Sequence, residues 1–218
     1  MTAKRYHLFL LISGLAVLAW SGAFPKERFT WLMETFPAVI GGAVLIATYR
    51  RFRLTSLTYT MIWVFSLVLM VGGHWTYAEV PLGFWIRDAL GLARNHFDRI
   101  GHVLQGVVPA MLAREVLLRT SPLRPGKWTF FLVTCIALAI SAGYELFEWG
   151  YAVAFGEGSE SFLGSQGDIW DAQWDMFLAL CGALAAQLAF SRWQDRQIAG
   201  QQHATQRHRG TDDKEAMD

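Results

Sequence analysis

The feature that most constrains the fold of this chain is a series of long segments without charged side chains. Between Arg5 and Lys26 twenty consecutive residues lack Asp, Glu, Lys and Arg, and between Arg53 and Glu79 there are twenty-five. A helix that crosses the hydrocarbon core of a bilayer needs about 20 predominantly apolar residues. Only 17% of all residues are charged, compared with roughly 25% in an average soluble domain. These segments predict a polytopic membrane protein.

Six membrane spans are expected. They lie near residues 8–24, 31–49, 54–78, 100–118, 128–154 and 174–193. A soluble domain of this size could not bury such apolar runs on all sides. The predicted fold class is therefore all-α: a bundle of about six transmembrane helices in a single domain, residues 1–195. The polar residues 196–218 are expected to form a disordered cytoplasmic tail.

The basic residues predict the orientation of the bundle. If six spans alternate, one side receives Lys4 and Arg5, the 50–53 arginines, the 119–127 connection and the tail. Cytoplasmic loops are enriched in Lys and Arg, so both termini are predicted to be cytoplasmic. Basic residues on the opposite side run against this rule: Lys26, Arg28, Arg87, Arg94 and Arg99. The first span could alternatively be a cleaved signal peptide, with a small-residue site at 21–23.

Charge and motifs exclude several functions. The chain has 19 Lys and Arg against 18 Asp and Glu, so no basic field is present that would hold nucleic acid. Signature motifs of metalloproteases, α/β-hydrolases, P-loop NTPases and CxxC proteins are absent from the sequence. The reaction class, and whether the protein is an enzyme at all, therefore stay open.

Ionisable residues gather at the predicted outer ends of four spans. Such residues are costly in a membrane and mark functional sites by default. Three sets have helical spacing that places their members on one face: 95, 98 and 102; 145 and 148; and 168, 171 and 175. We predict that one outer-facing cavity, with Asp98 and His102 at its centre, brings together His74, Asp98, His102, Glu145, Glu148, Asp171 and Asp175. The predicted catalytic residues are Asp98, His102, Glu145, Glu148 and Asp175, and the predicted binding residues are His74, Arg94, Arg99, Asp168 and Asp171.

A mixture of imidazole and carboxylate groups also suits a metal ion. Such ligands favour a divalent transition metal over calcium, which prefers oxygen alone. The candidate ligands are His74, Asp98, His102 and Glu148. A purely structural interpretation stands beside this one, in which Arg94, Arg99 and Asp98 form a salt-bridged loop and Asp168 caps a helix.

Four segments carry a family resemblance. GGHWTYAEVP (72–81), RNHFDRIGH (94–102), YELFEW (144–149) and GDIWDAQWDM (167–176) resemble the YjdF-like bacterial inner-membrane proteins. The resemblance covers nearly all of the chain up to about residue 195. Because that family is a domain of unknown function, it implies a multi-pass inner-membrane location and no activity.

A fainter similarity connects the chain with VanZ-like membrane proteins. The matching positions are Asp98-Arg99 with His102, Glu145 with Glu148, and Asp175 with Gly182. The chain departs from that pattern at Glu148, where Gln is commoner, and in having Asp168 and Asp171. This resemblance implies an envelope-related or lipid-related substrate.

Three functions follow as alternatives. The first is an enzyme or binding protein for a lipid-linked or envelope substrate at the outer leaflet, where Arg94 and Arg99 could hold a phosphate. The second is a small proton-coupled carrier that titrates Glu145, Glu148 and Asp175. The third is a structural or accessory membrane protein. Residues 129–143 carry no charge, which argues against a proton path through the fifth span. The expected partners are the lipid bilayer and, in the first alternative, a lipid-linked or envelope substrate, and the sequence indicates no oligomeric state.

Overall fold

The computed structural model describes residues 2–156 and 165–215, and within these ranges every regular element is a helix. Its six long helices are α1 (Ala3–Ala23), α2 (Arg28–Thr48), α3 (Ser56–Trp75), α5 (Phe97–Thr120), α6 (Lys127–Phe155) and α8 (Asp171–Glu215). A 3-10 turn, η1 (Tyr77–Glu79), and a short helix, α4 (Pro81–Leu90), connect α3 to α5. The predicted all-α class is confirmed.

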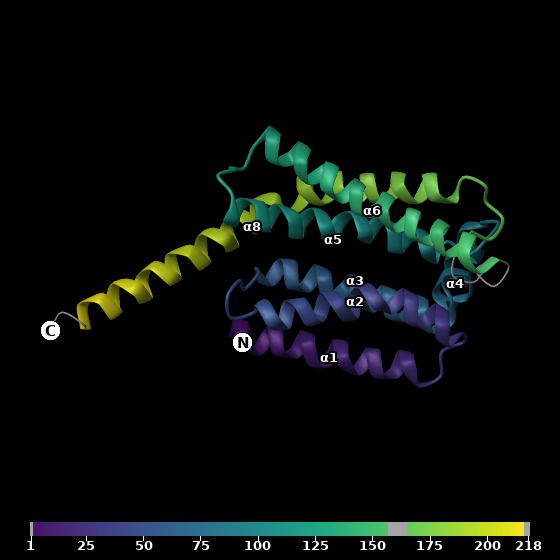
Figure 1. Ribbon diagram of the computed structural model, residues 1–218, viewed down its shortest axis with the longest axis horizontal. Helices are drawn as coiled ribbons and strands as arrows, with labels where there is room; N and C mark the ends of the chain where they lie inside the picture. The colour runs from purple at the N-terminus through teal and green to yellow at the C-terminus, as the bar shows by residue number, and fades with distance from the viewer. Residues whose placement is uncertain (1, 157–164, 216–218) are drawn as a thin grey trace.

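The long helices run side by side in alternating directions (Figure 1). The N-terminus and the α2–α3 and α5–α6 connections lie at one end of the bundle, and α4 lies at the other. Five of these helices are long and apolar enough to cross a membrane: α1, α2, α3, α6 as far as Ala154, and α8 as far as Gln202. The helix α5 has 24 residues but carries several ionisable side chains, many of them buried against its neighbours. The number of spans and their orientation stay predictions.

The bundle consists of two sets of three helices. Helix α3 packs against α1 and α2, whereas α5, α6 and α8 pack against one another, and the two sets meet chiefly along α3 and α5. The close approach of α5 to α8 requires glycine. A side chain at Gly106 would collide with the carbonyl of Ala179, and one at Gly182 would collide with that of Val103. Small residues of this kind let helix backbones approach closely in membranes.

The helix α8 continues past residue 195 to Glu215 and projects from the bundle (Figure 1). The division into a domain of residues 1–195 and a disordered tail of residues 196–218 stays a prediction. All six prolines of the chain lie before residue 126, so α8 contains no proline that would break it. Packing also continues past residue 195, because Ile198 is buried and the Gln197 side chain accepts a hydrogen bond from the Leu57 amide at 3.1 Å.

The sequence analysis did not predict α4. The helix begins with Pro81 at its first turn and ends at Gly91, which adopts the left-handed conformation with φ 63°. Its apolar side chains Leu82, Trp85 and Leu90 are exposed. An amphipathic helix at the end of a bundle is suited to lie in the membrane interface.

Candidate functional site

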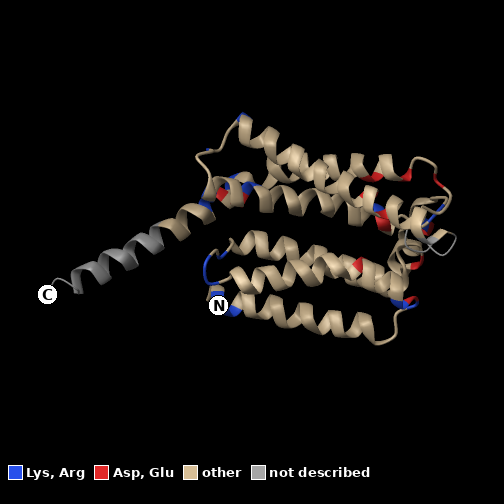
Figure 2. Ribbon diagram, viewed as in Figure 1, with Lys and Arg blue, Asp and Glu red and all other residues tan. Residues whose placement is uncertain are grey.

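The carboxylates concentrate at the end of the bundle that carries α4 (Figure 2). Asp98 and His102 occupy the first two turns of α5, where a spacing of four residues places them on one face. Asp175 lies in the second turn of α8, and Glu145 lies in the second half of α6. Three helices therefore deliver these side chains to one level.

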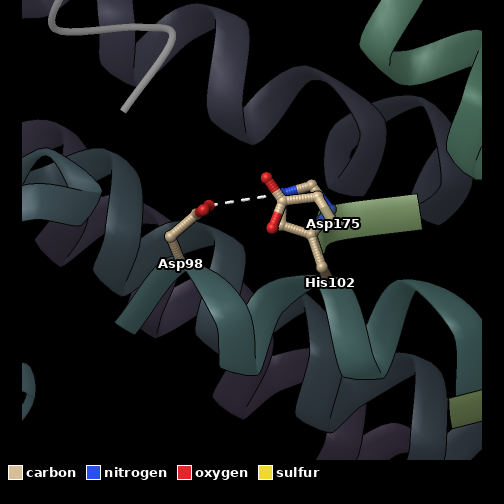
Figure 3. Close-up of side chains that lie close together, drawn as sticks. All are labelled: Asp98, His102 and Asp175. Atoms are coloured by element: carbon tan, nitrogen blue, oxygen red, sulfur yellow. Dashed lines mark ion pairs between the residues drawn. The ribbon is translucent and has the colours of Figure 1, made fainter. Parts of the chain in front are cut away.

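His102 is the centre of this group, which we call the His102 cluster: Asp98, His102, Glu145 and Asp175. The Nε2 atom of His102 lies 3.3 Å from Asp98 Oδ1 and 3.7 Å from Asp175 Oδ2. On the other side of the ring, Nδ1 lies 3.7 Å from Glu145 Oε1. Figure 3 shows the Asp98 carboxyl group pointing toward the His102 and Asp175 side chains. Both His102 and Asp175 are buried, with 7% and 2% of their surfaces exposed.

Several buried atoms of the cluster have no hydrogen-bond partner among the described residues. They are His102 Nδ1, Glu145 Oε1 and Asp175 Oδ1. Buried polar atoms in native proteins are nearly always hydrogen bonded, and exceptions point to strain, catalysis or a bound water, ion or ligand. The His102 cluster is thus an incompletely satisfied polar site inside the bundle.

A cavity of about 290 Å³ adjoins the cluster. Its ionisable lining consists of Glu34, Asp98, His102, Glu148 and two tyrosines, Tyr77 and Tyr144. The predicted group did not include Glu34, which comes from α2 and accepts a hydrogen bond from the Tyr144 hydroxyl at 3.4 Å. A lone buried carboxylate within an apolar span was the signal that could have revealed it.

The sequence analysis also missed Tyr77, which lies in η1 between α3 and α5. A side chain at Gly72 would collide with its ring, and one at Gly101 would press against it. The two glycines therefore make room for this tyrosine at the cavity wall. Burial raises the pKa of the Tyr77 hydroxyl well above its ordinary value, and the carboxylates of Glu34, Asp98 and Glu148 raise it further. The hydroxyl stays protonated at neutral pH.

Arg94 and Arg99 form a salt-bridge network that is separate from the His102 cluster. Arg94 Nη2 lies 3.1 Å from Asp168 Oδ2 and 2.9 Å from Asp171 Oδ1, and Arg99 Nη2 lies 3.1 Å from Asp168 Oδ2. Asp168 also accepts a hydrogen bond from the Trp170 amide at 3.0 Å, just before α8 begins. Two guanidinium groups are therefore balanced by two carboxylates. The structural interpretation, in which these arginines pair with Asp98, differs from these contacts, because both arginines pair with Asp168 and Asp171. A role of Arg94 and Arg99 in holding a phosphate stays a prediction.

His74 does not join the His102 cluster. Its Nδ1 atom lies 2.8 Å from the Ser21 carbonyl oxygen, and its ring stacks on Trp20 with centroids 4.5 Å apart. The end of α3 thus turns this imidazole toward α1. The predicted set of metal ligands is accordingly not assembled: Glu148 lines the cavity, while the close group is Asp98, His102 and Asp175.

A second, apolar cavity of about 510 Å³ lies between α2, α3 and α5. It shares Pro37, Phe65 and Leu69 with the polar cavity, so the two spaces adjoin. Along α2 its lining runs from Pro37 to Thr48, which is about 16 Å at the helical rise. That length is roughly half the thickness of a bilayer's hydrocarbon core.

A second polar cluster lies near the opposite end of α5. Glu115, with 0% exposed, accepts hydrogen bonds from the Thr55 amide at 2.8 Å, the Thr58 hydroxyl at 2.6 Å and the Arg119 guanidinium at 2.7 Å. The preceding residue, Arg114, donates to Gln194 Oε1 at 2.9 Å and pairs with Asp195 at 2.8 Å. We call this group the Glu115 cluster: Thr55, Thr58, Arg114, Glu115, Arg119, Gln194 and Asp195.

The helical bundle, its apolar spans and its buried polar site define a polytopic membrane protein. Residues 6–196 match the family model described as "Predicted membrane protein (DUF2238)", and the chain belongs to this family. It is also 50% identical over 201 residues to the "Inner membrane protein YjdF" of Escherichia coli (strain K12), covering 91% of this chain and 96% of that protein. No solved structure matches the chain. The predicted family and inner-membrane location are confirmed, and the VanZ-like resemblance stays a prediction.

Proposed function

We propose that this protein binds, and as an enzyme acts on, a lipid-linked or envelope substrate at the His102 cluster, on the periplasmic side of the inner membrane. The observation that carries the proposal is that a cavity with ionisable groups in its wall adjoins a second, apolar cavity. The cavity beside His102, which is otherwise lined mainly by apolar side chains, shares walls at Pro37, Phe65 and Leu69 with the apolar cavity along α2. An amphiphile has the same two parts, a polar group and a hydrocarbon chain.

The hydrocarbon part fits the apolar cavity. The walls are formed by aliphatic and aromatic side chains such as Leu45, Phe52 and Leu112, and ligand pockets of this kind commonly measure about 300 to 1,000 Å³. The cavity runs along the helix axes, which is the direction in which lipid chains lie in a bilayer.

The polar part faces hydrogen-bond acceptors. Glu34 and Glu148 line the cavity beside His102, whereas Arg94 and Arg99 are already paired with carboxylates. A substrate group that donates hydrogen bonds, such as a hydroxyl or an amine, suits this lining better than a bare anion. This sharpens the proposal toward a hydroxyl-bearing or amine-bearing lipid.

A proton-coupled carrier receives less support. From His102 to Glu115 along α5 the distance is about 20 Å, and the described side chains facing the intervening cavity are apolar apart from Thr48, Ser66 and Thr120. A carrier would need titratable groups along such a path. An accessory protein remains the second alternative, and it predicts that the polar cavity holds no ligand.

The test is retention of lipid by the purified full-length protein. Gly42 lines the apolar cavity, and a Cβ atom there would meet nothing within 4 Å, so Gly42→Phe places a ring in the cavity without a backbone clash. We expect native mass spectrometry to detect a specific bound lipid on the wild type and at least a tenfold lower occupancy on this variant.

The matched control is Gly150→Phe. Gly150 lies on α6 outside both cavities and also has open space around it, so its substitution should leave lipid occupancy unchanged. Equal occupancy in wild type and Gly42→Phe, or the absence of any specifically bound lipid, would contradict the proposal and favour an accessory role.

A further inference from the structure

We infer that Asp98, His102 and Asp175 form a binding site for one divalent transition-metal ion, of which zinc is the best fit. The identity of the substrate on which the ion would act rests on the proposed function, and the binding of the ion does not. Metal binding itself rests on the separations, burial and charge of these three residues, which contribute one imidazole and two carboxylates from two helices.

The separations of the ligand atoms agree with a metal site. Zinc binds imidazole nitrogen and carboxylate oxygen at about 2.0 to 2.2 Å, which places neighbouring ligand atoms of a tetrahedral site roughly 3.3 to 3.6 Å apart. His102 Nε2 lies 3.3 Å from Asp98 Oδ1 and 3.7 Å from Asp175 Oδ2. One ligand atom from each residue lies within 4.8 Å of the others. Small side-chain adjustments would bring all three around one ion.

The opposite side of the imidazole has the partner that metal-binding histidines use. A histidine ligand usually donates its second ring N–H to a carboxylate, which fixes the ring and raises its basicity. Glu145 Oε1 stands 3.7 Å from His102 Nδ1, and neither atom has a hydrogen-bond partner among the described residues. Glu145 therefore occupies the position of an orienting residue, with Nε2 left to face the ion.

Charge supports the same conclusion. Among the described residues that line the polar cavity, His102 is the one basic side chain, beside the carboxyl groups of Glu34, Asp98 and Glu148. Buried carboxylates are stable when they are paired or coordinate a metal, and Asp175 Oδ1 has no hydrogen-bond partner in the described part of the chain. A divalent cation would give this oxygen and the neighbouring carboxyl groups a partner.

The donor set indicates which ion. Calcium takes six to eight oxygen ligands and magnesium retains several waters, whereas imidazole with carboxylate suits zinc and its transition-metal neighbours. Three protein ligands would leave a fourth position open, as in catalytic rather than structural zinc sites. The adjoining cavity provides the space in which a water or a substrate group would occupy that position.

The experiment is zinc titration of the full-length protein in detergent after removal of bound metal with a chelator. We expect elemental analysis to find one zinc per chain in the wild type. His102→Gln and Asp175→Asn should lose that zinc, and Glu145→Gln should bind it with an affinity about 10- to 100-fold lower. His74→Gln is the matched control, because it removes a histidine at the same end of the bundle that lies outside the cluster.

A wild type without stoichiometric zinc, or a His102→Gln variant that binds as much zinc as His74→Gln, would overturn the inference. Circular dichroism and gel filtration of each variant separate loss of a ligand from loss of the fold. Lipid occupancy measured on the same preparations separates the two proposals. Bound lipid without zinc would refute the metal site alone, and bound zinc without lipid would refute the proposed function alone.

Discussion

The two ends of α5 bury carboxylates in opposite ways. At one end, Glu115 accepts four hydrogen bonds from Thr55, Thr58 and Arg119. At the other end, Glu145 and Asp175 approach His102 at 3.7 Å and each keeps an oxygen without a partner in the described structure. Both groups are ionisable and buried, and both include residues of α5 and α8.

The difference shows that burial of a charge does not by itself mark a functional site. A polar network whose members are all satisfied makes a bundle rigid and specific, and this is the role that the contacts of Glu115 support. A network with buried polar atoms that lack hydrogen-bond partners lowers the stability of the protein. Proteins keep such networks chiefly at sites that bind a ligand or carry out a reaction. The unsatisfied end also adjoins a cavity, whereas the Glu115 side chain is enclosed.

The sharpest test of this comparison asks which compartment each end faces. In a background with Cys135→Ala and Cys181→Ala, we expect Asp88→Cys, at the end with α4, to react in intact cells with a membrane-impermeant maleimide. Arg51→Cys, at the Glu115 end, should react only after lysis, because the basic loops are predicted to be cytoplasmic. Labelling of the second variant alone in intact cells would invert the orientation and place the His102 cluster on the cytoplasmic side.

The next effect concerns stability at the satisfied end. Replacing Glu115 with alanine should lower the free energy of unfolding by about 3–5 kcal/mol, because Arg119 and two threonines lose their buried partner. Unfolding of purified protein in mixed micelles of increasing SDS content measures this change. Glu79→Ala is the control, since Glu79 pairs with Lys26 with half of its side chain exposed, and exposed pairs contribute at most about 1 kcal/mol. Similar losses in the two variants would remove the distinction between the clusters.

The smallest change in stability is expected at the unsatisfied end. In metal-free protein, Asp175→Asn should alter the free energy of unfolding by no more than about 1 kcal/mol, because it removes a buried carboxylate whose partners are incomplete. The same variant should lose zinc. Unfolding in the same micelles gives the comparison. If Asp175→Asn were as destabilising as Glu115→Ala, the His102 cluster would be a structural network like the other.

Local signals in the sequence were sufficient for the helices and for the level of the site. Predominantly apolar runs of helical length indicated the six long helices, because a bilayer or a buried bundle demands apolar surface over that length. Spacings of three and four residues placed Asp98 with His102, and Glu145 with Glu148, on shared faces. Alternation of the helices then brought these faces to one end of the bundle.

The sequence did not show which helices pack against one another. Periodicity gives the face of a helix and leaves open which neighbour that face meets, since this depends on packing between residues far apart in the chain. His74 turned to α1 and Ser21, Glu34 entered the cavity from α2, and Arg94 and Arg99 found Asp168 and Asp171 about seventy residues away.

The sequence by itself determined that this protein is an all-helical membrane bundle with acidic and imidazole groups gathered at one end, because hydrophobic length and helical period are local properties of the chain. Only the tertiary structure decided which of those groups meet. Glycines at 106 and 182 bring α5 against α8, and this contact sets His102 beside Asp175 while it lets Arg114 reach Gln194. One packing contact thus produced a satisfied cluster and an unsatisfied one from side chains of the same kinds.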